Sequence, residues 1–348
     1  MIFKILLSLL IICVVVVSHE FGHYIIARMN GIVAKEFFIG MGPTLWKKQK
    51  GETLFSIKLL PLGGACVFGN EEDIEDPTQN SYLSAGVWKR IATIFAGPFF
   101  NFLLAFLLSL FVVGANGFTP TEVVEVTKGS PADNAGIQAG DSIVKFGNSK
   151  VYMYGEITFE TMYNQGTPIA VTINRNGEKI TTFVTPEYDK DYGRMMIGLT
   201  FSGTHQKPKP IETLKYSYAN VRYWIKISLK SLGMLLFGKA SVNELSGPVG
   251  ITVAVSEVYD EAANYGIMAI VYSMMDFAIL ITANLGVMNL IPFPVLDGGK
   301  LVFLFIEAFR KKPVSREIEG AVNLVGVVLL MLLMAYVMFN DIQKIFIS

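Results

Sequence analysis

Residues 5–27 read ILLSLLIICVVVVSHEFGHYIIA, an apolar run that only His19, Glu20 and His23 interrupt with ionisable side chains. About 20 mainly apolar residues cross the hydrocarbon core of a bilayer, so this stretch predicts a transmembrane helix. Lys4 ahead of an apolar run also resembles a secretory signal peptide. Such a peptide should end in a small-residue cleavage site, whereas here His-Glu follows and the apolar run resumes, so we expect the segment to be retained.

Three further stretches have the length and composition of membrane spans: residues 91–118, 262–296 and 321–340. The whole chain is 52% hydrophobic and only 17% charged, with a mean hydropathy of +0.46. These values predict a polytopic α-helical membrane protein with four transmembrane helices, surrounded by the lipid bilayer. The formal net charge is zero, so nothing indicates a nucleic-acid partner.

Basic residues gather in two of the segments that connect the spans. They are Arg28, Lys35, Lys47, Lys48, Lys50, Lys58, Lys89 and Arg90 in the first, and Lys300, Arg310, Lys311, Lys312 and Arg316 in the second. Connecting segments rich in Lys and Arg stay in the cytoplasm. In a bacterial plasma membrane, both termini and the long segment between the second and third spans would then be extracytoplasmic.

We divide the chain into four parts: residues 1–118, 119–200, 201–260 and 261–348. In the first part, short β-like runs at 36–39 and 54–59 are bounded by turn sequences at 40–43 and 61–64. Since residues 59–68 are unusually apolar for a loop, we expect a membrane-associated cytoplasmic β-hairpin at about 35–68.

Residues 119–200 read as a small β-rich domain. Asn176-Gly177 between two β-like runs is a strong hairpin signal. The run GSPADNAGIQAGDSI at 129–143 resembles the signature of PDZ domains from bacterial membrane proteases. Such a domain binds extended peptide ends by adding a strand to a sheet edge. The other reading is a size filter over the active site, and the sequence leaves both open.

Residues 201–260 begin with a linker and continue into an amphipathic helix. Its basic residues repeat on one face of the helix: Lys215, Arg222, Lys226 and Lys230. We expect this helix to lie in the membrane interface. A fifth span is the alternative, but charges repeated through its middle would be costly.

The sequence His19-Glu20-Phe21-Gly22-His23 carries the chemistry. On a helix the two histidines lie one turn apart, so both imidazoles can bind one zinc ion, and Glu20 can take a proton from water. The alternative is a buried cluster without a function. Ionisable groups inside a span are costly and usually functional, which favours the zinc site.

A catalytic zinc usually has three protein ligands and one open position. The carboxylates available in or beside the spans are Asp276 and Asp297. The charge distribution places His23 and Asp297 toward the cytoplasmic ends of their spans, whereas Asp276 is 21 residues earlier, roughly 30 Å along a helix. Asp297 is therefore the predicted third ligand. Two prolines precede it and predict an extended backbone at Pro292–Pro294.

HExxH in the first span, together with NLIPFPVLDG at 289–298, resembles the site-2 protease family of intramembrane zinc metalloproteases. Stretches at 40–43, 61–64, 96–101 and 246–251 are similar to its bacterial RseP/RasP-like branch, although this chain has a single PDZ signature where some relatives have two.

The resemblance implies Zn²⁺ held by His19, His23 and Asp297, with Glu20 as the catalytic base. It also implies that Asn289, Pro292 and Pro294 handle the substrate. The substrates would be transmembrane segments of single-span membrane proteins, for example anti-sigma factors or signal-peptide remnants.

Two other readings remain. One is a non-catalytic membrane PDZ scaffold with a structural metal, although such a site does not need Glu20. The other is a zinc transporter, which would need polar residues in spans that have almost none.

Overall fold

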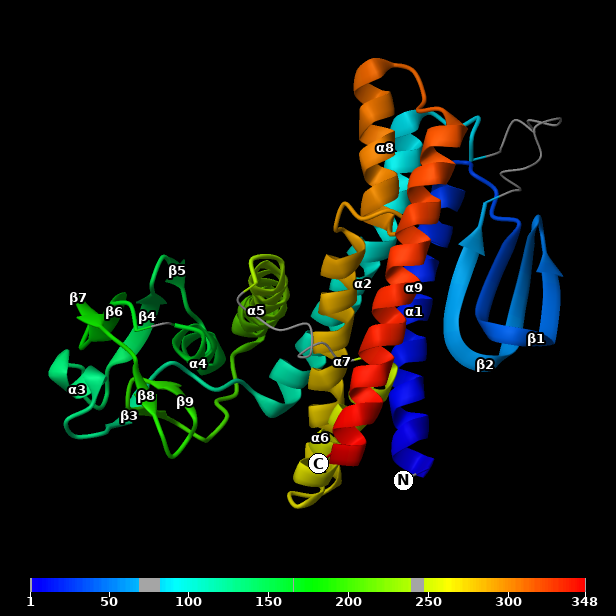
Figure 1. Cartoon of the computed structure of the whole chain (residues 1–348). Helices are drawn as coiled ribbons and strands as arrows, with labels where there is room; N and C mark the ends of the chain where they lie inside the picture. The colour runs from blue at the N-terminus through cyan, green and yellow to red at the C-terminus, as the bar shows by residue number, and fades with distance from the viewer. Residues whose placement is uncertain (1, 69–81, 165, 239–246, 348) are drawn as a thin grey trace. The chain divides into compact units, whose positions relative to one another are not determined.

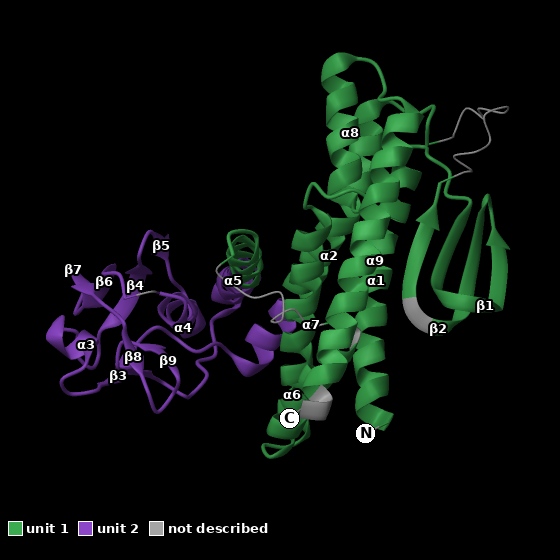
Figure 2. Cartoon of the chain, viewed as in Figure 1, with its two compact units in different colours: residues 1–108, 224–348 green, residues 109–223 purple. Residues whose placement is uncertain are grey.

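The computed structural model describes residues 2–68, 82–164, 166–238 and 247–347 (Figure 1). The chain divides into two compact units (Figure 2). Residues 1–108 and 224–348 form unit 1, and residues 109–223 form unit 2.

Within the described residues, four helices are long and apolar enough to cross a membrane. They are α1 (Ile2–Met29), α2 (Val87–Asn116), α7 (Ile267–Asn289) and α9 (Arg316–Ile347). All four expected spans are therefore helical, and three of them extend a few residues beyond the expected start. The amphipathic helix expected in 201–260 is α5 (Pro210–Leu236). Its place in the membrane interface stays a prediction.

The third span is shorter than expected, because residues 262–296 do not form one segment. Helix α6 (Pro248–Ala263) ends first, and Gly266 adopts a φ of +99° before α7 begins. Glycine adopts this conformation without a Cβ penalty, so the chain can turn between two apolar helices. Helix α6 is an element that the sequence did not predict, although Pro248 at its first turn suits a helix start.

The helices of unit 1 are joined by small apolar clusters. Ile11 of α1 packs with Val255 of α6 and Met274 of α7. Ile94 of α2 packs with Leu301 and Leu304 of α8 (Asp297–Arg310). Helices α1 and α2 approach closely at Gly22, where a Cβ would lie 2.5 Å from the carbonyl oxygen of Ala96.

Strands β1 (Glu36–Lys50) and β2 (Thr53–Val67) form a sheet of their own. The sequence predicted that turns at 40–43 and 61–64 bound two short strands, and this was wrong. Each strand continues through its predicted turn and bends there, with Gly40, Gly42 and Gly63 at φ values of +78° to +89°. The register shows that residues 36–39 pair with both 54–57 and 64–67.

An aromatic cluster attaches this sheet to α1. Tyr24 lies 5.6 Å from both Phe37 and Phe55, measured between ring centroids. Since Tyr24 directly follows His23, the cluster fixes β1 and β2 beside the histidines. Association of this sheet with the membrane stays a prediction.

Unit 2 is built mainly from short strands. Its elements are β3 (Val123–Val126), α3 (Pro131–Asn134), β4 (Ser142–Phe146), β5 (Ser149–Lys150), α4 (Tyr154–Met162), β6 (Ile169–Arg175), β7 (Glu178–Val184), β8 (Glu187–Asp189), β9 (Arg194–Met196) and β10 (Leu199–Phe201). Four strands form a sheet in the order β5-β4-β6-β7, while β10 pairs with β3 and β8 with β9. The predicted hairpin is confirmed, because Arg175 pairs with Glu178 across Asn176 and Gly177, both at positive φ.

Candidate metal centre

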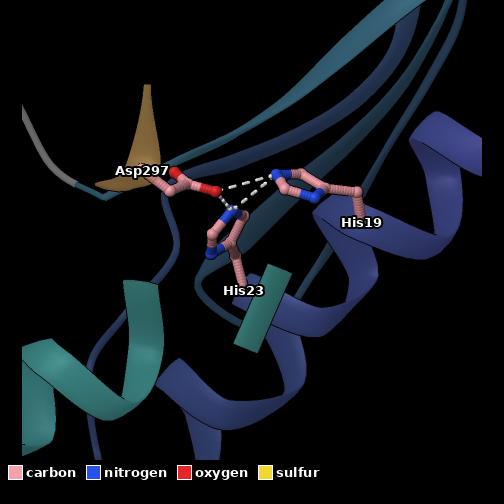
Figure 3. Close-up of side chains that lie close together, drawn as sticks. All are labelled: His19, His23 and Asp297. Carbon is pink, nitrogen blue, oxygen red and sulfur yellow. Dashed lines mark hydrogen bonds and ion pairs between the residues drawn. The ribbon is translucent and has the colours of Figure 1, made fainter. Parts of the chain in front are cut away.

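Helix α1 presents two buried imidazoles to the same point (Figure 3). His19 and His23 are one turn apart, and their Nε2 atoms lie 3.1 Å from each other. Their rings are nearly perpendicular, at 85°. The 3.1 Å separation shows that the edges carrying Nε2 face each other.

Asp297 completes a triangle with these two atoms. It is the first residue of α8, and its Oδ2 lies 3.0 Å from His19 Nε2 and 3.3 Å from His23 Nε2. Ligands at roughly 2.0–2.1 Å from a tetrahedral zinc ion lie about 3.3 Å from one another, so the three separations suit such an ion.

The hydrogen bonding of the three atoms also fits a metal. The buried Asp297 Oδ2 has no hydrogen-bond partner. A buried carboxylate oxygen without a donor is uncommon in proteins. A divalent cation between the three side chains would supply the missing partner, and three protein ligands would leave one position open. Among the described residues, this group of possible metal ligands comprises His19, His23 and Asp297, without Asp276.

A tightly turned loop delivers Asp297 to the site. The Phe293 amide donates to the carbonyl of Ile291 at 2.7 Å, and the Leu296 amide donates to the carbonyl of Phe293 at 3.2 Å. The extended backbone expected at Pro292–Pro294 was therefore wrong.

Two glycines permit this turned conformation. A Cβ on Gly298 would lie 2.1 Å from the Ile291 carbonyl oxygen, and one on Gly299 would lie 2.3 Å from that of Phe293. The loop can fold back onto the start of α8 only because these positions lack side chains.

The loop also carries backbone strain beside the ligand. Val295 has a φ of +79°, which is a real outlier for a β-branched residue. Its amide donates to Oδ1 of Asn323 on α9 at 3.4 Å. Pro294 packs against α9 as well, since a Cβ on Gly326 would lie 2.4 Å from the Pro294 Cβ. Contacts with α9 therefore support the strained loop.

Glu20 is held by the β-sheet. Its Oε2 accepts a hydrogen bond from the backbone amide of Cys66 in β2 at 2.9 Å. The carboxylate also interacts electrostatically with His19, His23 and Asp297. Strand β2 thus keeps this carboxylate near the three candidate ligands.

The residues expected to handle the substrate lie at the end of α7 and in the following loop. The Asn289 Nδ2 lies 3.5 Å from both ring nitrogens of His19. Pro292 and Pro294 belong to the turned loop before Asp297. The structure thus brings Asn289 to the metal ligands, while the two prolines lie in the segment that joins it to Asp297.

Helix α2 contributes residues that sequence reasoning did not assign to the site. The Thr93 carbonyl lies 2.9 Å from His23 Nδ1, and the Asn101 side chain lies 3.1 Å from His19 Nδ1. A Cβ on Gly97 would lie 2.3 Å from His23 Nε2. The spacing of four between these residues marks one helix face and was a signal that could have identified them.

Comparison with known proteins gives similar sequences over nearly the whole chain. A protein of Clostridium acetobutylicum named as a zinc metalloprotease is 36% identical over 98% of this chain and 97% of its own. The regulator of sigma-W protease RasP of Bacillus subtilis is 29% identical over 94% of this chain and 95% of its own. Among solved structures, the PDZ domain of an SdrC-like protein from Listeria innocua is 18% identical, with a TM-score of 0.23 over 26% of this chain and 99% of that one.

The family model for peptidase family M50 matches residues 7–333 of the 348. This range contains every candidate ligand, Glu20 and the loop that presents Asp297. The chain belongs to peptidase family M50, the site-2 proteases.

Proposed function

We propose that this chain is a zinc metalloendopeptidase that cleaves transmembrane segments of single-span membrane proteins inside the bilayer. One observation carries the proposal: the Nε2 atoms of His19 and His23 converge with the Oδ2 of Asp297, which accepts no hydrogen bond. Both histidines belong to a helix that is long and apolar enough to cross a membrane.

Zn²⁺ would be held by His19, His23 and Asp297. When bound, it would polarise the scissile carbonyl and lower the pKa of a water molecule. Two neutral imidazoles and one carboxylate are a usual ligand set for catalytic zinc.

Glu20 is the proposed general base. It would take a proton from the attacking water and then deliver it to the leaving amine. Its hydrogen bond from the Cys66 amide would hold the carboxylate in place between these two transfers.

Asn289, Pro292 and Pro294 are the proposed substrate-binding residues. A transmembrane helix hides its carbonyl groups in its own hydrogen bonds, so the substrate must unwind locally before attack. The Asn289 amide would bond one of the freed backbone groups. Since the loop is turned rather than extended, the prolines would not pair with the substrate as a strand. Pro292 would contact it through an exposed ring, and Pro294 through the part of its ring that α9 leaves accessible.

Unit 2 supports a further part of the proposal. We assign residues 119–200 to a PDZ domain on the basis of the signature at 129–143, in a region where the structure has a β-rich unit. It would bind peptide ends by strand addition or exclude large substrates. The domain and both termini would be extracytoplasmic, and the metal centre would lie near the cytoplasmic side of a bacterial plasma membrane.

The natural substrates would be single-span proteins such as anti-sigma factors or signal-peptide remnants. One relative is named as a regulator of sigma-W protease, which favours the first of these two classes.

The deciding experiment compares the full chain with its Glu20→Gln variant in detergent, using a model transmembrane peptide. We expect cleavage to fall by about 100-fold or more, because a general base contributes roughly 10²–10⁴-fold. Bound zinc should remain, since Glu20 is not a proposed ligand. Equal cleavage by both proteins would count against Glu20 as the base, and no cleavage above background by either would favour a non-catalytic PDZ scaffold with a structural metal.

A further inference from the structure

Metal-binding histidines need their second ring nitrogen fixed. A neutral imidazole carries one proton, and only the nitrogen without it can bind a metal. The partner of the other nitrogen decides where the proton lies. In this chain the nearest partner of each comes from α2, at 2.9 Å for His23 and 3.1 Å for His19, while Asn289 of α7 lies farther from His19 Nδ1, at 3.5 Å.

His23 is fixed by the main chain. Its Nδ1 lies 2.9 Å from the carbonyl oxygen of Thr93, a group that can only accept a hydrogen bond. The Thr93 hydroxyl donates to the Lys89 carbonyl at 2.8 Å, so it is occupied within its own helix. Nδ1 of His23 must therefore carry the proton, which leaves Nε2 free toward Asp297.

His19 faces a side-chain amide instead. Asn101 is fully buried, with its Nδ2 placed 3.1 Å from His19 Nδ1 and with no hydrogen-bond partner for its Oδ1. The oxygen and nitrogen of an amide exchange places when the group rotates by 180°, and they are assigned from the hydrogen-bond network. If nitrogen faced His19, Nδ1 would accept and Nε2 would carry the proton. That proton would prevent His19 from binding the metal with the atom that points at Asp297.

The opposite orientation agrees with the rest of the site. With Oδ1 toward His19, Nδ1 donates to it and Nε2 is free, as in His23. The Asn101 backbone carbonyl accepts a hydrogen bond from Thr282 of α7 at 3.1 Å, so neighbouring helices hold this residue in position. Gly97, one turn before Asn101, leaves room for both imidazoles against α2.

We propose that Asn101 is a positioning residue whose amide oxygen accepts the Nδ1 proton of His19 and so keeps Nε2 available to the metal. This inference rests on the proposed zinc site. One face of α2 would then bond the Nδ1 atoms of both histidines: the main-chain carbonyl of residue 93 would bond His23, and the side-chain amide of residue 101 would bond His19.

The test measures zinc affinity of the full chain in detergent by competition with a chelator. Asn101→Leu keeps a similar volume without an acceptor and should weaken zinc binding by about 10- to 100-fold. Asn101→Asp keeps an acceptor oxygen and should bind zinc with nearly the affinity of the unmodified chain. Asn116→Leu removes the other amide of α2, about 22 Å along the helix, and serves as the control.

The Asn101→Asp variant separates the two amide orientations. If nitrogen faced His19, it would keep the proton on Nε2, and replacing it by leucine or by a carboxylate would leave zinc affinity unchanged or higher. Normal or tighter zinc binding by Asn101→Leu would therefore overturn the inference. An equal loss of affinity in Asn101→Leu and Asn101→Asp would overturn it as well, because the acceptor oxygen would then make no difference. An unmodified chain that binds zinc no better than His19→Ala would instead overturn the proposed zinc site, and the inference with it.

Discussion

The carboxylate of Glu20 on α1 and the backbone amide of Cys66 on β2 are joined by a hydrogen bond of 2.9 Å. The proposed base is therefore held by a main-chain group of another element. Because this N–H bonds Glu20, a proline at this position would remove the contact at little cost to the sheet. Proline is tolerated in strands where the missing N–H is not part of the ladder.

We predict that Cys66→Pro lowers kcat/KM for a model transmembrane peptide by about 10- to 100-fold, because hydrogen bonds to charged groups contribute roughly 1.5–3 kcal/mol. Bound zinc should be unchanged. Cys66→Ala keeps the amide and should cleave like the unmodified chain. Equal rates for the proline and alanine variants would show that this contact does not position the base.

Gly97 lies against both histidines, and this gives a second prediction. An added Cβ would lie 2.3 Å from His23 Nε2 and 2.8 Å from His19 Cε1, so the rings would have to leave their positions. Gly97→Ala should therefore abolish stoichiometric zinc binding, measured by metal analysis of the purified chain.

The same helix offers a matched control. Among the described residues, a Cβ on Gly114 would come within 4 Å of the Thr213 side chain alone, at an ordinary 3.6 Å. Gly114→Ala should keep the zinc, and its helix propensity should stabilise α2 by about 0.5–1 kcal/mol. Zinc retention by both variants would contradict the geometry of the site.

Asp341 of α9 caps the start of α6. Its buried Oδ2 accepts hydrogen bonds from the amides of Gly247 and Gly250, both at 2.9 Å. Free amides and the helix dipole both favour a carboxylate at this end.

We predict that Asp341→Ala destabilises unit 1 by about 1–2 kcal/mol, as loss of a helix cap does. Asp341→Asn retains an acceptor and should lose less. Thermal unfolding in detergent would measure both, and an unchanged midpoint for the alanine variant would exclude a stabilising cap.

Asp141 in unit 2 predicts a pH dependence of stability. Burial alone would raise the pKa of Asp141, but hydrogen bonds from Arg175 at 2.7 and 2.8 Å and from the Gln138 amide at 2.8 Å lower it. A lowered pKa means that the ionised carboxylate stabilises the folded unit. This contribution is present above the unfolded pKa of about 3.9 and is lost as the pH falls through the folded value.

The unfolding midpoint of Asp141→Asn should accordingly lie below that of the unmodified chain at pH 7. The difference should shrink once the pH falls below about 4. Asp191→Asn, which changes an exposed carboxylate of the same unit, should show no such difference at pH 7. If the unfolding midpoints of Asp141→Asn and the unmodified chain differed by the same amount at every pH, ionised Asp141 would not be the source of the stabilisation.

The sequence was most informative where chemistry and spacing agree. HExxH on a helix places two imidazoles together by helix geometry alone, and depth along the spans favoured Asp297 over Asp276. Asn176-Gly177 identified its hairpin because both residues accept positive φ. The roles of the site residues remain predictions that the experiments above address.

Other features depend on contacts that a linear reading does not contain. The average hydropathy of 262–296 hides both the bend at Gly266 and the turned loop that follows α7. The prolines at 292 and 294 suggested an extended chain, whereas the close approach that Gly298 and Gly299 permit makes it turn. Thr93 contributes a backbone carbonyl, so its side chain gives no indication of its role, and only its spacing of four from Gly97 could have identified it.

The carbonyl of Thr93 has an evolutionary consequence. Every amino acid supplies that oxygen, so His23 can keep its orientation with any residue at 93 that fits this fully buried position and keeps α2 helical. His19 depends on a side-chain acceptor instead, and only a few amino acids would present one at 101. Substitutions at 101 should therefore change zinc affinity more often than substitutions at 93. The support of His19 would then be less tolerant of mutation than the support of His23.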